Sequence, residues 1–341
     1  MSSEFIPQPP KRIGLVLGAG GVAGMAFHAG ALWALHHDLG WDARDADVIV
    51  GTSAGSIIGS MLRAGVAPED LAAWATDASP TAGGRKFRAL MLHADRLAPV
   101  ARLPSPTLPG WVALGTFAHP TQLRAALTSM LPHGLADQTP RLAIVDRLLP
   151  EWPSKPLWIS AVRVGDGRLT WFGRTDPAGA HTGPDMRAEI DGRRERVRPA
   201  DAVAASCAIP VLARPVQIGR HRYIDGGVHS PTSADALAEH DLDLVIVLSP
   251  MGHIAGEASR SPARRLAQRR LQREVRLLRA RNTDVQVISP DASTIRMMGW
   301  NMLERDNSGR VMRTAFLGTS PQLHPDVNTL LRRTRTAADV A

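Results

Sequence analysis

The sequence DVIVGTSAGSIIGSML at residues 47–62 places one serine between two apolar runs and surrounds it with small residues. The β-branched run before the serine predicts a short buried strand, and the run from Ser56 onward predicts a helix. So tight a turn crowds the backbone, and small residues are needed two positions before and after its apex, at Gly51 and Gly55. The pattern is typical of a nucleophile elbow that holds Ser53 in a strained, exposed conformation. A packing turn with an idle serine is the alternative.

A second glycine-rich turn lies upstream, in the sequence GAGGVAG at residues 18–24. It follows an apolar run at residues 13–17 that predicts a strand, and it precedes a helix that we expect from about Val22 to His37. Free backbone N–H groups at the start of a helix bind negative charge. They suit the pyrophosphate of a dinucleotide-binding oxidoreductase, with Asp38 or Asp42 on the ribose, or the oxyanion hole of an acyl-transfer enzyme. Because a serine elbow has no role in a nicotinamide site, we favour the oxyanion hole.

The same region also has the length of a membrane span. Residues 13–35 contain no Asp, Glu, Lys or Arg, and Lys11 and Arg12 precede them as in a signal peptide. Six glycines and His28 interrupt this window, however, and the break at Gly18 divides it into a strand and a helix. We therefore expect it to belong to a soluble domain.

A candidate general base follows two short predicted strands at residues 215–218 and 222–224. Asp225 comes directly after the second strand, and Gly226 and Gly227 after it allow another loop to approach closely. A carboxylate is ionised at neutral pH and accepts a proton from a hydroxyl within hydrogen-bonding distance. An ordinary Asp-Gly turn is the competing interpretation.

Other reactive side chains are few. None of the twelve histidines lies in a late strand-end loop of the kind that carries a triad histidine, and His229 is the best of them. The single cysteine, Cys207, cannot form an intramolecular disulfide, which suits a reducing compartment. Its small apolar neighbours predict a buried side chain. No spacing of Asp and His residues indicates a metal site, so we expect no metal.

The glycine loop at 18–24, the elbow at 51–55 and the Asp-Gly-Gly sequence at 225–227 together resemble the patatin-like phospholipase family in their order and spacing. The sequences HAG at 28–30 and ASCAIP at 205–210 support the resemblance, which covers about residues 11–250 and, less clearly, 298–317. It implies an α/β fold, a three-layer α/β/α domain with a central, mostly parallel sheet. It also implies chemistry that requires no cofactor.

The resemblance further implies a serine acyl hydrolase, of the phospholipase A or lysophospholipase type, that cleaves lipid carboxylic esters through an acyl-enzyme. Its implied residues are the nucleophile Ser53, the base Asp225, the oxyanion-hole amides of Ala19, Gly20 and Gly21, and the supporting glycines Gly51, Gly55 and Gly226. Ala23 stands where many members carry Arg or Lys. This difference affects the expected substrate more than the expected chemistry. A non-catalytic binding module of the same fold and the dinucleotide-binding oxidoreductase remain the alternatives.

We expect terminal tails at residues 1–10 and 321–341 and one hydrolase domain at 11–320. Within it, residues 79–155 form a variable flap or cap region, with a flap beside the active site at 103–115 and a helix at 121–127. Residues 158–172 predict a hairpin around a Gly-Asp-Gly turn.

Residues 262–281, PARRLAQRRLQREVRLLRAR, predict a basic amphipathic helix. Such a helix either packs on the domain with its arginines in solvent or lies on an anionic membrane. The formal net charge of +8 comes almost wholly from arginine, and no nucleic-acid-binding motif accompanies it, so we expect no nucleic acid partner. The expected partner is a lipid or phospholipid ester substrate, in the cytoplasm or at the inner face of the membrane. The oligomeric state does not follow from the sequence.

Overall fold

The central sheet has eight strands in the computed structural model, which describes residues 11–75, 84–85, 139–174, 187–190, 193–254, 261–328 and 331. The strands are β1 (Ile13–Leu17), β2 (Val48–Gly51), β3 (Leu157–Arg163), β4 (Leu169–Phe172), β7 (Val216–Ile218), β8 (His221–Asp225), β9 (Leu244–Leu248) and β10 (Asp284–Ile288). Their order is β10-β9-β1-β2-β3-β8-β7, with β4 paired to β3 outside this path. Two further strands, β5 (Arg187–Ile190) and β6 (Arg193–Arg196), form a separate pair.

The strand register brings three chain segments to one edge of the sheet. Strands β10, β9, β1, β2 and β3 are parallel, and the last residues of β1 and β2, Leu17 and Gly51, lie opposite each other. Strand β8 runs antiparallel to β3 and ends at Asp225, which pairs with Ala161. Ala161 lies two residues beyond Ile159, the partner of Gly51. The turns after β1 and β2 and the end of β8 therefore meet at the carboxyl edge of the parallel strands.

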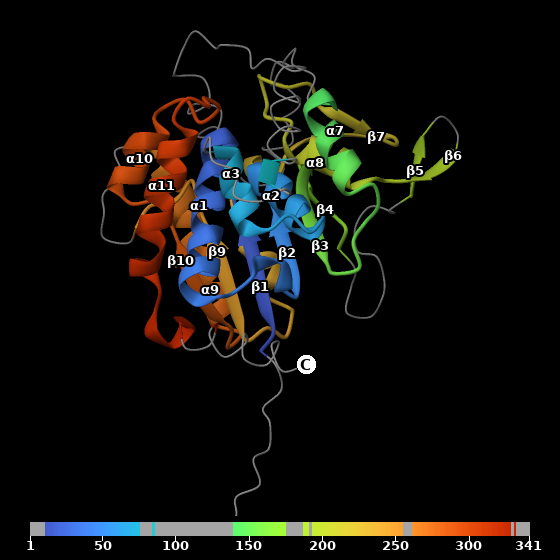
Figure 1. Cartoon of the computed structure of the whole chain (residues 1–341). Helices are drawn as coiled ribbons and strands as arrows, with labels where there is room; N and C mark the ends of the chain where they lie inside the picture. The colour runs from blue at the N-terminus through green and yellow to red at the C-terminus, as the bar shows by residue number, and fades with distance from the viewer. Residues whose placement is uncertain are drawn as a thin grey trace, which may run out of the picture.

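Helices cover both faces of the sheet (Figure 1). The α-helices are α1 (Gly21–Leu39), α2 (Ala54–Arg63), α3 (Pro68–Ala75), α7 (Thr139–Leu148), α8 (Pro199–Ser206), α9 (Pro262–Arg279), α10 (Ala292–Met298) and α11 (Ser308–Thr319). The short 3₁₀ helices are η1 (Ala43–Asp45), η2 (Gly226–Val228), η3 (Ala234–Leu237) and η4 (Ser320–Gln322).

Side chains that alternate along β1 feed two separate hydrophobic clusters. Leu15 and Leu17 of β1 join the cluster that includes α1, α2 and α11, whereas Val16 joins the cluster that includes η3 and α9. Helix α11, near the carboxyl end of the chain, packs beside α1 (Figure 1). The predicted three-layer α/β/α fold with a mostly parallel sheet is confirmed.

Most predicted elements appear with small shifts of their ends. The hairpin expected at 158–172 is formed by β3 and β4, and the basic helix expected at 262–281 is α9. The predicted flap at 103–115 and helix at 121–127 lie outside the described residues, as does the tail at 1–10. No helix in the described part of the chain combines the length and apolar composition needed to cross a bilayer.

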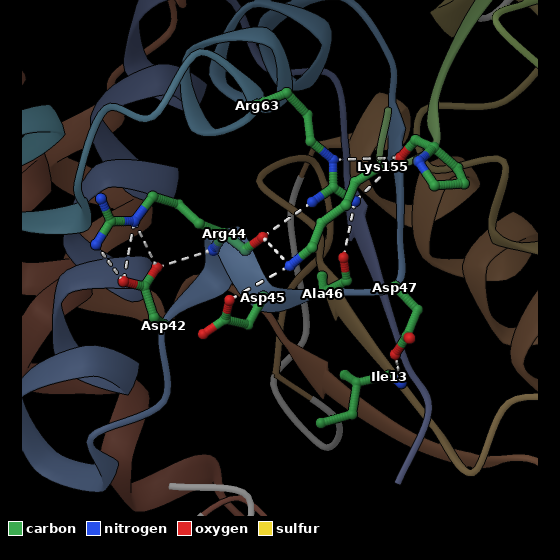
Figure 2. A network of polar contacts seen from close by, with 9 residues as sticks. Ile13, Asp42, Arg44, Asp45, Ala46, Asp47, Arg63 and Lys155 are labelled. Carbon is green, nitrogen blue, oxygen red and sulfur yellow. Dashed lines mark hydrogen bonds and ion pairs between the residues drawn. The ribbon is translucent and has the colours of Figure 1, made fainter. Parts of the chain in front are cut away.

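A polar network at the opposite edge of the sheet holds the far end of α2 (Figure 2). Arg63, the last residue of α2, donates from Nη1 to the carbonyl oxygen of Arg44 at 3.0 Å. Its Nη2 donates to the carbonyl oxygens of Ala46 at 2.8 Å and Pro156 at 3.0 Å. Burial lowers the pKa of Arg63 to about 10, so the guanidinium stays charged at neutral pH. The helix that begins at the elbow is thus anchored at its other end.

The crossing of α1 and α11 requires a glycine. A Cβ atom at Gly30 would lie 2.2 Å from the carbonyl oxygen of Met312. Gly30→Ala should therefore lower the free energy of unfolding by about 1–3 kcal/mol, as overpacking of a core does. Urea denaturation measures this change. Gly165→Ala, in a turn where an added Cβ meets nothing within 4 Å, is the matched control and should change it by less than about 0.5 kcal/mol. Equal losses in the two variants would contradict the close helix contact.

Candidate active site

Ser53 directly precedes α2 and is separated from the end of β2 by Thr52 alone. Its φ of 51° and ψ of −117° are unusual for a residue with a side chain, which agrees with the strain expected at an elbow. The side chain is 5% exposed, so the prediction that it is exposed is wrong. The reason is that Asp225 and Ser206, which are distant in the chain, contact Ser53. The local pattern does not reveal such contacts.

The glycines of the elbow are required because the turn presses against the end of β1. A Cβ atom at Gly55 would lie 1.9 Å from the carbonyl oxygen of Leu17, and one at Gly51 would lie 2.6 Å from the Cα atom of Ser56. The backbone N–H of Thr52 donates to the same Leu17 carbonyl at 3.0 Å. Since Leu17 directly precedes the glycine loop, these contacts place the elbow beside that loop.

Hydrogen bonds hold the backbone of Ser53 on both sides. Its N–H donates to Ser206 Oγ at 2.8 Å, and its carbonyl oxygen accepts a bond from Ser56 Oγ at 2.7 Å. Ser206 is fully buried at the last turn of α8. Sequence reasoning did not identify this role, because the only signal was a serine among small residues, far from the elbow in the chain.

Asp225 ends β8 beside the serine. Its side chain is 6% exposed and accepts hydrogen bonds from the Ser53 hydroxyl and, at 2.7 Å, from the N–H of Gly227. Burial raises the pKa of Asp225 to about 6, although both hydrogen bonds act to lower it. The carboxylate is therefore ionised at neutral pH and is a stronger base than an exposed aspartate.

Gly226 allows β8 and β3 to approach closely at this point. A Cβ atom on Gly226 would lie 2.2 Å from Ser160 Oγ of β3. The same Ser160 hydroxyl lies 2.8 Å from Thr52 Oγ1 in the elbow. One buried side chain of β3 thus touches both the segment with the aspartate and the segment with the serine.

The first half of the glycine loop is fixed by hydrogen bonds. The N–H of Gly18 donates to the Leu248 carbonyl of β9 at 3.0 Å, and the N–H of Ala19 donates to the Pro231 carbonyl at 2.7 Å. The expectation that Ala19 contributes to an oxyanion hole is therefore wrong, because its N–H already has an acceptor. Within the described part of the chain, the N–H groups of Gly20 and Gly21 have no acceptor.

His28 supports this loop from α1. It is fully buried, and its Nε2 lies 2.7 Å from the carbonyl oxygen of Gly18. Burial lowers the pKa of His28 to about 4, so the ring is neutral at physiological pH and donates this bond through Nε2–H. The histidine in the predicted HAG sequence therefore has a supporting role at the loop.

The three motifs meet in space. A Cβ atom on Gly227 would lie 3.4 Å from the Cβ atom of Ala19, which joins the aspartate segment to the glycine loop. A Cβ atom on Gly24 would lie 3.6 Å from the Cβ atom of Ala54, which joins the start of α1 to the elbow. A serine, a buried carboxylate and two backbone amides that have no acceptor among the described residues are therefore grouped at one edge of the sheet, as acyl transfer requires.

The side chains considered for a catalytic triad or for a dinucleotide site form other interactions. His229 Nε2 lies 3.0 Å from Arg270 Nη2 and accepts its hydrogen bond, so that nitrogen is not free to act as a base. Asp42, a candidate ribose ligand, caps η1 and binds Arg44. Across the described residues, no group of three or more His, Cys, Asp or Glu side chains is placed to hold a metal ion.

Comparison with known proteins identifies one matching family. The chain matches the family model described as "Patatin-like phospholipase" over residues 15–238. No curated protein matches.

Solved structures of a human protein are also similar. "Human GIVD cytosolic phospholipase A2" has a TM-score of 0.45 and 11% identity, with 96% of this chain and 63% of that chain covered. The same human protein in complex with methyl gamma-linolenyl fluorophosphonate has a TM-score of 0.43 and 14% identity, with 96% and 60% covered. The chain therefore spans less than two thirds of the length of these human structures.

The pKa of Asp225 leads to a pH-dependent reactivity of Ser53. A fluorophosphonate should label Ser53, at a rate that falls as the pH decreases through about 6, because protonated Asp225 no longer accepts the serine proton. Intact-mass spectrometry between pH 5 and pH 8 measures the rate. Ser53→Ala should give no adduct, and His229→Ala should keep the wild-type profile. A labelling rate that is constant over this range would contradict the role of Asp225.

Proposed function

Because the chain belongs to the patatin-like phospholipase family, whose members hydrolyse lipid esters, we propose that it is a serine acyl hydrolase with a Ser-Asp dyad. Its substrate is a lipid or phospholipid carboxylic ester, cleaved through an acyl-enzyme. The observation that carries the proposal is the hydrogen bond between Ser53 and the buried Asp225.

The first step forms the acyl-enzyme. Ser53 Oγ attacks the carbonyl carbon of the ester while its proton passes to Asp225. The N–H groups of Gly20 and Gly21 donate to the oxyanion, and each donor of this kind contributes about 2.7–4 kcal/mol to transition-state stabilisation. The bond to the leaving alcohol then breaks, and the proton on Asp225 passes to the alkoxide.

The second step releases the acyl group. Water attacks the acyl-enzyme with Asp225 again as the base, and the serine regains its proton as the carboxylic acid leaves. All the groups invoked belong to the protein backbone, Ser53 and Asp225.

A non-catalytic module with the same fold is the less favoured function. The conformation of Ser53 costs of the order of 1–3 kcal/mol, and such strain is usually retained where it serves chemistry. A binding module also has no use for a buried carboxylate next to that serine. Both features favour the hydrolase.

The dyad is tested by Asp225→Asn, which keeps the size of the side chain and removes its basicity. Turnover of a short activated ester should fall by at least ~10²-fold, at the lower end of the effect of general-base catalysis. Ser53→Ala should abolish turnover with the fold intact. Asp166→Asn, in the β3–β4 turn, is the matched control and should stay near wild type. Full activity in Asp225→Asn would rule out the dyad.

The proposal includes peripheral contact with an anionic membrane through the outer face of α9. This face carries five exposed arginines: Arg265, Arg269, Arg273, Arg276 and Arg279. Among the described residues none of the five has a carboxylate partner within 4.0 Å. Exposed arginines on one side of an amphipathic helix attract anionic lipid head groups at roughly 1 kcal/mol each. This would keep the enzyme close to its substrate.

Vesicle sedimentation tests this contact. Wild type should bind phosphatidylcholine vesicles that contain phosphatidylglycerol more tightly than phosphatidylcholine alone, and added salt should weaken the binding. Replacement of Arg269, Arg273 and Arg276 by Gln should weaken it about tenfold or more. The matched control replaces three exposed arginines of α10 and α11 by Gln: Arg296, Arg310 and Arg313. Equal losses in the two triple variants would show that only net charge matters and would overturn the assignment to α9.

A further inference from the structure

A buried glutamate on the inner face of α9 binds the segment that follows the catalytic aspartate. Glu274 is 3% exposed. Its carboxylate accepts hydrogen bonds from Ser230 Oγ at 2.5 Å, from Thr232 Oγ1 at 2.6 Å and from the N–H of Ala234 at 2.9 Å. All three donors lie within residues 230–234, so one side chain fixes this whole segment.

The centre of that segment touches the glycine loop. Pro231 lies between the two residues whose hydroxyls bind Glu274, and its carbonyl oxygen accepts the N–H of Ala19 at 2.7 Å. The same oxygen would lie 3.1 Å from a Cβ atom at Gly18. Glu274 therefore fixes the segment whose Pro231 carbonyl oxygen accepts the N–H of Ala19.

Of the three anchors of Gly18 and Ala19, which are Leu248, His28 and Pro231, only Pro231 lies outside a helix or strand. Leu248 belongs to β9 and His28 to α1, so their positions are set by regular hydrogen bonding. The position of the Pro231 carbonyl depends instead on side-chain contacts of its neighbours. An irregular segment holds one conformation only if such contacts specify it.

The burial of the Glu274 carboxylate opposes folding, because the charged group loses its hydration. Burial raises the pKa of Glu274 above its usual range, and the charge of the nearby Asp235 acts in the same direction. Among the described residues its ion-pair partner is Arg270, whose Nε lies 3.7 Å from Glu274 Oε1. A buried ion pair is weak evidence for stability, which favours a role in placing the segment.

We propose that Glu274 is a positioning residue for the oxyanion hole, acting through the Pro231 carbonyl and the Ala19 peptide on the N–H groups of Gly20 and Gly21. The inference rests on the proposed function. The peptide that carries the Ala19 N–H directly precedes the peptide that carries the Gly20 N–H, so the bond to Pro231 fixes the backbone from which the two amides project. An oxyanion hole stabilises the transition state only when its donors are held in place beforehand, so loss of this support should lower kcat and leave KM nearly unchanged.

The test is Glu274→Gln in the full chain, measured with a neutral ester and with a trifluoromethyl ketone. Glutamine keeps the size but replaces one acceptor oxygen by an NH₂ group, so it cannot accept all three bonds. We expect kcat to fall about tenfold or more, with KM within about twofold. The inhibition constant of the ketone, whose adduct places an oxyanion in the same hole, should rise by the same factor as kcat falls.

Two further variants separate positioning from stability. Leu271→Ala shortens a buried apolar side chain of α9 that makes no hydrogen bond to residues 230–234. It should lower Tm at least as much as Glu274→Gln does, while kcat below the transition stays at wild type. Thr232→Val removes one donor at constant size and should lower kcat in part. Combined with Glu274→Gln it should add little further loss, since both act on one contact.

The outcomes are distinguishable. The positioning role is overturned if Leu271→Ala, at equal Tm, lowers kcat as much as Glu274→Gln does. It is also overturned if the losses of kcat in Glu274→Gln and Thr232→Val simply add in the double variant. Should Glu274→Gln fail to fold, unchanged kcat in Thr232→Val alone overturns it. An inactive Ser53→Ala beside a fully active Glu274→Gln rejects this inference and leaves the proposed function standing. An active Ser53→Ala rejects both.

Discussion

The hydrogen bond between the Ser53 hydroxyl and the Asp225 carboxylate is the interaction on which the site depends. Both side chains are at most 6% exposed, so the carboxylate loses most of its hydration and its pKa rises to about 6. The bond from Gly227 limits that rise, which leaves the group ionised at neutral pH and still basic. In the proposed mechanism this single aspartate takes the serine proton, with no histidine between them.

Close packing of backbone brings these two residues together. At Gly55 and Gly226 an added Cβ atom would lie about 2 Å from atoms of β1 and β3, so only glycine permits the approach. The parallel register of β1 and β2 sets both turns at one edge, and the antiparallel β8 delivers Asp225 to the same edge. Helix α9 completes the arrangement from the opposite layer, because Glu274 binds the segment whose carbonyl fixes Ala19.

Local patterns predicted individual strands, turns and helices, and the family resemblance implied the fold, but neither predicted contacts between distant segments. The strand, turn and helix around Ser53 followed from residues 47–62 alone, and the Gly-Asp-Gly turn predicted the β3–β4 hairpin. The bond from Ala19 to Pro231 joins residues far apart in the chain, and so does the bond from Ser53 to Ser206. Such pairings depend on how the sheet is assembled, so the occupied amide of Ala19 and the burial of Ser53 were not foreseen.

The most direct test of the Ser-Asp mechanism is to find the acyl group during turnover. An activated ester is mixed with the enzyme, the reaction is stopped with acid within the first turnover, and peptides are mapped by mass spectrometry. The account predicts the acyl mass on the peptide that contains Ser53, at lower yield in Asp225→Asn. Hydrolysis with Ser53 unmodified and the acyl group on another side chain would contradict it, as would undiminished acylation of Ser53 in Asp225→Asn.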